Sequence, residues 1–166
     1  MPINVVEDLD LEDLRRSFRP EPIQTLFVGE SAPRSGKFFY THNTGLYRAI
    51  KQAFNGSDDF LSGFRASGFY LDDLSLVPVN GMAPGERREQ CKASIPSFSS
   101  RLREYQPASI VILVRSIDKW VREAVAQAKL EVPVYNVTYP GRFQKLREQF
   151  QNEMAIIIPQ LLIETK

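Results

Sequence analysis

Residues 25–50 read TLFVGESAPRSGKFFYTHNTGLYRAI, and this stretch organises the rest of the chain. A short apolar run at 25–28 predicts a buried strand, and apolar residues spaced by three and four after Thr44 predict a helix over 45–54. The loop between them holds about fifteen residues, and loops of that length between a strand and a helix are usually functional. Ligands of open α/β sheets bind beyond the carboxyl ends of the strands. We therefore expect the functional site in this loop.

The rest of the chain continues the alternation of strand and helix. Strands are predicted at 23–28, 69–77, 109–114 and 132–137, and helices at 10–18, 45–54, 60–67, 86–105, 118–129 and 143–165. Parallel strands need helical crossovers, so this order favours helices on both faces of a mostly parallel sheet. We therefore predict one domain over residues 1–166, an α/β protein built as a three-layer α/β/α sandwich with a central four-stranded mostly parallel sheet. A kink is expected at Pro96, and a kink or break at Pro159.

Composition and charge limit the classes of protein that fit the chain. Its 166 residues, 43% hydrophobic and 25% charged, are typical of a globular domain with a core. No apolar run reaches the roughly 18 residues that span a bilayer, and the acidic start lacks the features of a signal peptide. We expect a cytoplasmic monomer with no membrane partner. The net charge of +1 is low for a protein that holds nucleic acid by electrostatics alone, so any such contact must come from local patches.

Several kinds of site are disfavoured by single residues. Cys91 is the only cysteine, so it forms no internal disulfide and cannot by itself hold a zinc ion or an iron–sulfur cluster. We expect a buried thiol, with no metal and no cofactor. Lys37 follows a glycine, but the P-loop pattern fails at both ends, where Ser31 and Phe38 replace the required residues. We interpret the basic residues of the helix predicted over 86–105 as a solvated face rather than a track for DNA; they are Arg87, Arg88, Lys92, Arg101 and Arg103.

A series of short motifs, taken in order, resembles the uracil-DNA glycosylase superfamily. The first is GESAP at 29–33, followed by Phe39 and by GLY at 45–47, and it looks most like the GE-A-P-G form of the iron–sulfur branch of that family. The later motifs are YLDDLS at 70–75, PGERREQC at 84–91, PASIVI at 107–112 and TYPG at 138–141. The resemblance covers most of the chain, and the family's four-stranded parallel sheet between helices agrees with the fold predicted above.

The resemblance implies base excision, in which a base is turned out of the duplex into a pocket and its N-glycosidic bond is cut by water. On the matching positions, Glu30 would orient or activate the water. Phe39 would stack on the base, and Ala32 and Asp73 would complete the base-binding site. Tyr139 occupies the place of the family's histidine, which stabilises the negative charge that develops on the leaving base.

DNA contacts are implied for the loop at 139–142. Gly141 would allow close approach to the minor groove, and Arg142 would hold a flanking phosphate. Lys37 is a further candidate for a phosphate contact. His42 stands beside three aromatic residues in the sequence and is a candidate for a catalytic or phosphate contact.

Three positions depart from the family pattern. Tyr139 can donate one hydrogen bond but carries no positive charge, and losing such a stabilising group commonly costs about two to three orders of magnitude in rate. Asp73 stands nearest to the family's base-reading asparagine. An ionised aspartate only accepts hydrogen bonds, so it would repel O4 of uracil and suit an amino group such as cytosine N4 or adenine N6. Of the iron–sulfur ligands, only Cys91 falls near a counterpart.

Other readings of the same residues remain open at this stage. Glu30 and Asp73 could be structural carboxylates in a salt bridge or a cap, and at least one of the three aromatic residues at 38–40 should belong to the core. The leading hypothesis is a DNA glycosylase-like hydrolase whose partner is DNA or a nucleotide-like ligand. A non-catalytic nucleotide or nucleic-acid binding module on the same fold is the alternative, and a hydrolase of free nucleosides is a third.

Overall fold

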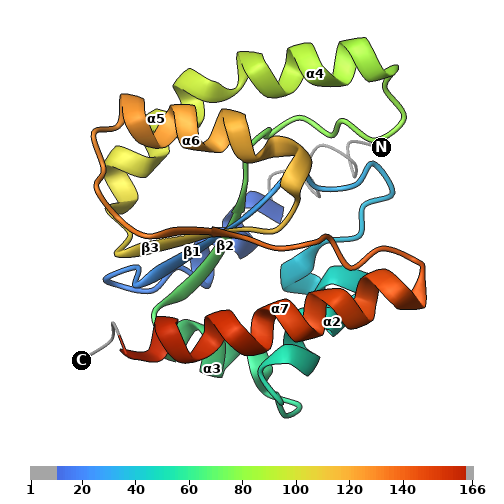
Figure 1. The fold of residues 1–166 in the computed structure, drawn as a ribbon, viewed down its shortest axis with the longest axis vertical. Helices are drawn as coiled ribbons and strands as arrows, with labels where there is room; N and C mark the ends of the chain where they lie inside the picture. Colours follow the sequence, from blue (N-terminus) through green and yellow to red (C-terminus); the bar gives the residue numbers. More distant parts are fainter. Residues whose placement is uncertain (1–10, 164–166) are drawn as a thin grey trace.

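Four parallel strands form the centre of the computed structural model, which describes residues 11–163 (Figure 1). They are β1 (Thr25–Gly29), β2 (Phe69–Asp73), β3 (Ser109–Ile112) and β4 (Val134–Asn136), and they lie in the order β2-β1-β3-β4. At the carboxyl edge of the sheet, Gly29 at the end of β1 is paired with Asp73 at the end of β2. The predicted α/β class and its four-stranded parallel sheet are therefore confirmed.

Helices cover both faces of the sheet, as predicted for a three-layer sandwich. One face carries α2 (Gly45–Ala53), α3 (Phe60–Ala66) and α7 (Gln144–Ile163), and the other carries α4 (Pro84–Ala93), α5 (Ile95–Tyr105) and α6 (Asp118–Gln127) (Figure 1). Two short 3-10 helices, η1 (Phe39–Thr41) and η2 (Arg115–Ile117), follow β1 and β3, and residues 11–17 form a further helix. Within residues 11–163, no helix has both the length and the apolar character that crossing a membrane requires.

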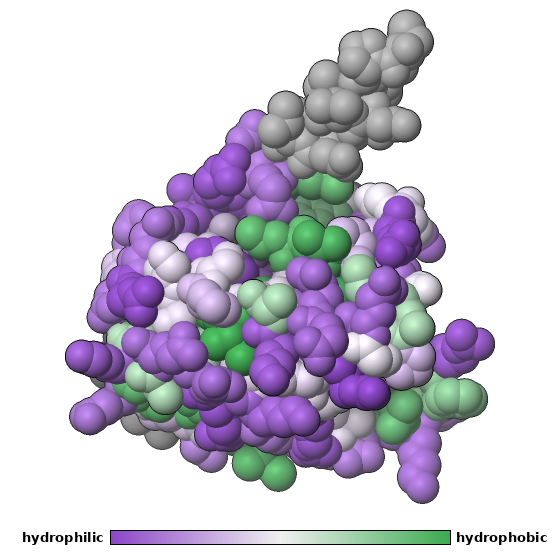
Figure 2. All heavy atoms as spheres, turned by 90° about the horizontal axis from the view of Figure 1, so that it is seen from above, coloured by the Kyte–Doolittle hydropathy of each residue, from purple (hydrophilic) through white to green (hydrophobic). Residues whose placement is uncertain are grey.

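The core forms where these layers meet the sheet. Every residue of β1, β2 and β3 is buried, as expected for strands covered on both faces. Around β1 and α3, five phenylalanine rings have centroids 5.4 to 6.2 Å from their neighbours; they are Phe27, Phe54, Phe60, Phe64 and Phe69. Thr44 caps α2, because its hydroxyl accepts a hydrogen bond from the Tyr47 amide at 3.0 Å. The outer surface seen from above Figure 1 is mainly hydrophilic with small apolar areas (Figure 2).

Two predicted boundaries are wrong for local reasons. The helix expected over 86–105 is two helices that meet at Ser94, because Pro96 lies in the first turn of α5, where its missing N–H costs nothing. The second strand ends at Asp73 rather than at 77, because the hydroxyl of Ser75 bonds both the amide and the carbonyl of Val77 and turns the chain.

The remaining boundaries differ by smaller amounts. Pro159 lies inside α7, which continues without a break to Ile163. The third strand begins at Ser109, as predicted, but ends at Ile112 rather than at 114. The fourth strand, Val134–Asn136, is shorter at both ends than the predicted range 132–137. The first residue of the helix predicted over 10–18 and the last two of the helix predicted over 143–165 lie outside the described residues.

Candidate functional site

A cavity of about 330 Å³ opens at the carboxyl edge of the sheet, where the loops after β1, β2 and β4 come together. Five residues singled out from the sequence line it: Glu30, Ala32, Phe39, Asp73 and Tyr139. The other lining residues include Arg15, Phe38, Asn80 and Arg87. A separate depression of about 580 Å³ lies at the amino ends of β1 and β2, between Pro20 and Gly68, and holds none of the predicted site residues.

Glu30 leaves the end of β1 and is held by two side chains of α4. Arg87 donates to both carboxylate oxygens, from Nε to Oε2 at 2.8 Å and from Nη2 to Oε1. The thiol of Cys91 donates to Oε2 at 3.5 Å. The Glu30 side chain is 13% exposed, so this two-point ion pair is partly shielded from water and fixes the orientation of the carboxylate.

Cys91 is buried, as predicted from the sequence. Burial raises the pKa of its thiol to about 11, and the negative charge of Glu30 and the hydrogen bond to it act in the same direction. The thiolate is the reactive form of cysteine. Cys91 therefore serves as a neutral hydrogen-bond donor to Glu30 and not as a nucleophile.

Asp73 ends β2 and points its carboxylate towards the end of β1. Its Oδ2 atom accepts a hydrogen bond from Arg15 Nη2 at 3.2 Å. A Cβ added to Gly29 would stand 2.5 Å from its Oδ1 atom, so this oxygen lies against the glycine backbone. Burial raises the pKa of Asp73 to about 6; Arg15 opposes this shift and the neighbouring Asp72 adds to it. Asp73 is thus a cavity carboxyl whose charge changes near neutral pH.

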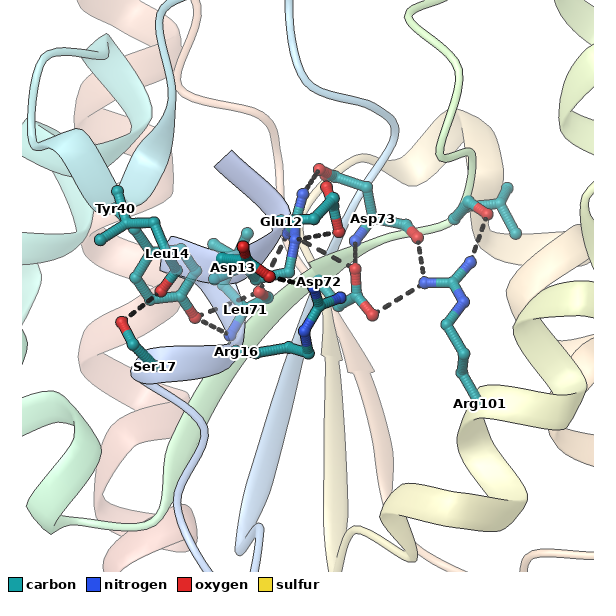
Figure 3. A network of polar contacts seen from close by, with 12 residues as sticks. Glu12, Asp13, Leu14, Arg16, Ser17, Tyr40, Leu71, Asp72, Asp73 and Arg101 are labelled. Atoms are coloured by element: carbon teal, nitrogen blue, oxygen red, sulfur yellow. Dashed lines mark hydrogen bonds and ion pairs between the residues drawn. The ribbon is translucent and has the colours of Figure 1, made fainter. Parts of the chain in front are cut away.

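Asp72 precedes Asp73 in β2, is also buried, and points towards α5 (Figure 3). Its Oδ2 atom accepts hydrogen bonds from Arg101 Nη1 at 2.8 Å and from the Tyr105 hydroxyl at 2.7 Å. Its Oδ1 atom lies 3.4 Å from Arg15 Nη1. Two adjacent buried carboxylates are thereby balanced by two arginines from different helices, which makes the network internally compensated.

Arg15 connects this network to the helix over 11–17. Its guanidinium bonds the carbonyl of Leu71 at 3.2 Å and lies 4.8 Å from the centre of the Phe38 ring. The side chain is only 4% exposed. Burial alone would lower its pKa, but the charges of Asp73 and Asp72 raise it above the ordinary value, so Arg15 is permanently cationic. The N-terminal helix therefore supplies a fixed positive charge to one wall of the cavity.

Aromatic rings form the apolar part of the cavity. Phe39 is 5% exposed and packs edge-on against Tyr40 and Tyr47, with centroid distances of 4.9 and 5.7 Å. The Tyr40 hydroxyl is fixed by Leu71, whose amide donates to it at 2.7 Å. Phe38 and Phe39 both line the cavity from this packed base. All three residues at 38–40 belong to the core, and two of them also face the cavity.

The loop after β4 carries Tyr139 to the cavity and is anchored just before it. The Thr138 amide donates to Glu153 Oε1 at 2.6 Å, and Arg115 bonds the Thr138 hydroxyl at 2.6 Å and Glu153 Oε2 at 2.9 Å. Tyr139 itself is 44% exposed. Burial of part of the ring raises the pKa of its phenol, and the negative charges of Asp73 and Glu30 add to the shift. Tyr139 thus remains a neutral donor at the mouth of the cavity.

Four predicted site residues do not line the cavity. His42 is exposed, with a φ of 51°, and its ring lies 5.9 Å from that of Tyr47. Lys37 and Arg142 are exposed and Gly141 is half-buried, each within three residues of a lining residue. Their positions suit contacts outside the cavity. The backbone amide of His42 donates to the carbonyl of Phe39, a lining residue, at 2.9 Å.

The sequence reasoning missed the cations of the site. Arg87 and Arg101 were expected on a solvated face, and this is wrong because they pair with Glu30 and Asp72 across helix–sheet contacts. Arg15 was not considered for the site at all. One signal was present: two consecutive aspartates at the end of an apolar strand must find buried cations. Within residues 11–163, no group of three or more metal-binding side chains occurs.

No family model matches the chain, and no curated protein matches its sequence.

Proposed function

We propose that the cavity binds a base turned out of a nucleic acid strand and that Glu30 orients a water molecule to cleave the N-glycosidic bond of that base, as in the uracil-DNA glycosylase superfamily. The observation that carries the proposal is that Glu30, Phe39, Asp73 and Tyr139, from three separate strand ends, line one cavity. Its volume of about 330 Å³ lies at the lower end of the range of small-ligand pockets. The protein acts in this proposal as a cytoplasmic monomer.

The residues take complementary roles in this reaction. The ring of Phe39 holds the base by stacking. The Asp73 carboxylate accepts a hydrogen bond from an exocyclic amino group. Water attacks C1′ as the bond between C1′ and the base nitrogen breaks, and the water gives a proton to Glu30. The Tyr139 hydroxyl donates to the base as it leaves with the electron pair of that bond.

Nucleic acid contacts outside the cavity fall to the neighbouring loops. Lys37 precedes the aromatic residues that line the cavity, and Gly141 and Arg142 follow Tyr139. Lys37 and Arg142 are exposed and are free to reach phosphates. With a net charge of +1, binding depends on these few local contacts, so log affinity should fall with log salt by only about 0.7 to 0.9 per phosphate contacted.

The test is release of free base from single- and double-stranded oligonucleotides. Substrates carry uracil, hypoxanthine, xanthine, or an unmodified cytosine or adenine opposite a mismatch. Glu30→Ala should abolish release, and Glu89→Ala, which removes an exposed carboxylate of α4 outside the cavity, is the matched control and should leave it unchanged. If no base is released from any substrate, and Glu30→Ala alters nothing, the hydrolase proposal is wrong.

Binding without cleavage is the second candidate, and one observation favours it. Arg87 donates to both oxygens of Glu30 and Cys91 donates to Oε2, so fewer acceptor sites of the carboxylate remain for the proton of water. A base-binding module on the same fold needs only the aromatic floor and Asp73. It predicts salt-dependent binding of oligonucleotides that Phe39→Leu weakens, with no release of base at any enzyme concentration.

A further inference from the structure

Four charged residues line the cavity, and one of them differs from the rest in exposure. The side chains of Arg15, Asp73 and Glu30 are 4%, 9% and 13% exposed, but that of Arg87 is 43% exposed. Arg15 and Asp73 are tied to each other in the buried network. Arg87 is therefore the cavity cation that a ligand arriving from solvent can reach.

The ion pair between Arg87 and Glu30 uses two donors of the arginine and both oxygens of the carboxylate. Nε and Nη2 of Arg87 are spent on the two oxygens of one carboxylate. Glu30 keeps a second donor in this position, because Cys91 Sγ lies 3.5 Å from Oε2. If Arg87 leaves, Cys91 still holds the carboxylate at Oε2, and the acceptor sites that the arginine had taken on both oxygens become free. Release of the arginine therefore opens further acceptor sites on Glu30 while the thiol keeps the side chain in place.

The helix that carries Arg87 is weakly embedded. Cys91 is the only buried residue of α4, and the helix begins after a long loop that follows β2. The fork of donors on Arg87 suits a phosphate group as well as it suits a carboxylate.

We propose that Arg87 is a latch that Glu30 holds in the free protein and that a backbone phosphate of the bound nucleic acid releases, which frees Glu30 for water. This inference rests on the proposed function, because it takes the phosphate to come from the strand whose base enters the cavity. It makes Arg87 a phosphate-binding and positioning residue. It also explains how Glu30 can be bonded to Arg87 in the free protein and still accept a proton from water once nucleic acid is bound.

The test is a double-mutant cycle read by binding of a fluorescent single-stranded oligonucleotide. In Glu30→Gln, the neutral amide holds Arg87 less tightly and leaves it free for phosphate. We expect the variant to bind about fivefold more tightly than the unchanged protein. This gain corresponds to the largest free energies measured for partly exposed ion pairs, which the variant no longer has to break. Arg87→Ala should weaken binding and lower the slope of log affinity against log salt by about one. In the double variant the gain from Glu30→Gln should vanish.

Arg88→Ala is the matched control, because Arg88 is an exposed cation on the same helix with the same charge. The gain from Glu30→Gln should persist in that background. Should Glu30→Gln fail to fold, Glu30→Ala gives the same expectation, since it also removes the carboxylate that holds Arg87.

Two outcomes separate the latch from the function on which it rests. If the oligonucleotide binds but Glu30→Gln gives no gain, or the gain survives Arg87→Ala, the latch is wrong and base binding stands. If the unchanged protein binds no oligonucleotide at low salt, the proposed function and the latch are both wrong.

Discussion

The Oδ1 atom of Asp73 fills the space in which a side chain at position 29 would begin, because a Cβ on Gly29 would stand 2.5 Å from it. The two residues are paired across neighbouring strands, at the carboxyl edge where the cavity opens. The glycine thus lets a carboxylate fold back over the sheet edge and form part of the cavity wall. Its role here is close approach and not an unusual backbone conformation.

Replacing Gly29 by alanine should therefore displace the Asp73 carboxylate. Since Asp73 is buried and bonded to Arg15, the shift disturbs a fixed network. We expect Gly29→Ala to lower the free energy of unfolding by about 1–3 kcal/mol, measured by urea denaturation. Gly63→Ala is the control: nothing lies within 4 Å of an added Cβ in that exposed helical position. It should raise stability by about 0.5–1 kcal/mol, and equal effects at both sites would contradict the close contact.

Removing the buried Asp72 should lower the free energy of unfolding far more than removing an exposed aspartate. Asp72 is 2% exposed and compensates Arg101 and Arg15, so Asp72→Ala leaves buried cations short of a partner. We expect a loss of about 3–5 kcal/mol in the free energy of unfolding. Asp13→Ala removes the partner of Arg16 in a pair whose side chains are 68% and 63% exposed, and it should cost less than about 1 kcal/mol. If Asp72→Ala lowers the free energy of unfolding by less than Asp13→Ala does, the buried ion pairs of Asp72 do not stabilise the fold.

The fold was predictable because it depends on local apolar patterns. The run SIVILV at 109–114 and the apolar residues at 25–28 indicated covered strands, and residues 109–112 and 25–28 do lie in buried strands. The boundary at Ser94 was not predicted, because an extended helical pattern does not say whether a proline bends a helix or starts a new one. That choice is decided by packing on the sheet, which the local sequence does not contain.

The candidate site was predictable in its acids and aromatic rings but not in its cations. Glu30 and Phe39 could be located because both follow a strand end at short distance along the chain. Arg87 pairs with Glu30 from 57 positions away, and Arg15 with Asp73 from 58. Surface arginines and site arginines look alike on a helix, and only the crossing of the helix over the sheet edge distinguishes them.

The raised pKa of Asp73 predicts how stability depends on pH. Burial is the main cause of the shift to about 6, whereas an aspartate of an unfolded chain titrates near roughly 3.9. Between these values the folded protein binds the proton more tightly, so this group makes stability fall as pH rises from about 4 to about 6, by up to about 1.4 kcal/mol per pH unit. Above that window its effect is constant. Urea denaturation across the range measures this, and Asp73→Asn should remove the slope.

The affinity for a base with an exocyclic amino group should rise with pH, whereas the contribution of Asp73 to stability falls. The proposed acceptor is the ionised form of Asp73, so binding should strengthen as pH rises through about 6. Cytidine and uridine oligonucleotides form the matched pair, because only the former presents an amino group. Equal pH dependence for both would contradict the role of Asp73 in reading the base.

The exposed ring of Phe143 suggests a contact with nucleic acid whose removal leaves the stability of the fold unchanged. It is 66% exposed, directly follows Arg142, and stands four residues beyond the cavity residue Tyr139. An exposed ring in that place can stack on a base next to the one in the cavity, which is worth about 1–3 kcal/mol by alanine substitution. Phe143→Ala should weaken oligonucleotide binding by that amount and leave the thermal midpoint unchanged. Ile156→Ala, at a position 68% exposed within α7, is the control for loss of surface apolar area. If the two variants bind oligonucleotide equally well, Phe143 makes no stacking contact and the nucleic acid surface does not extend along the loop after β4.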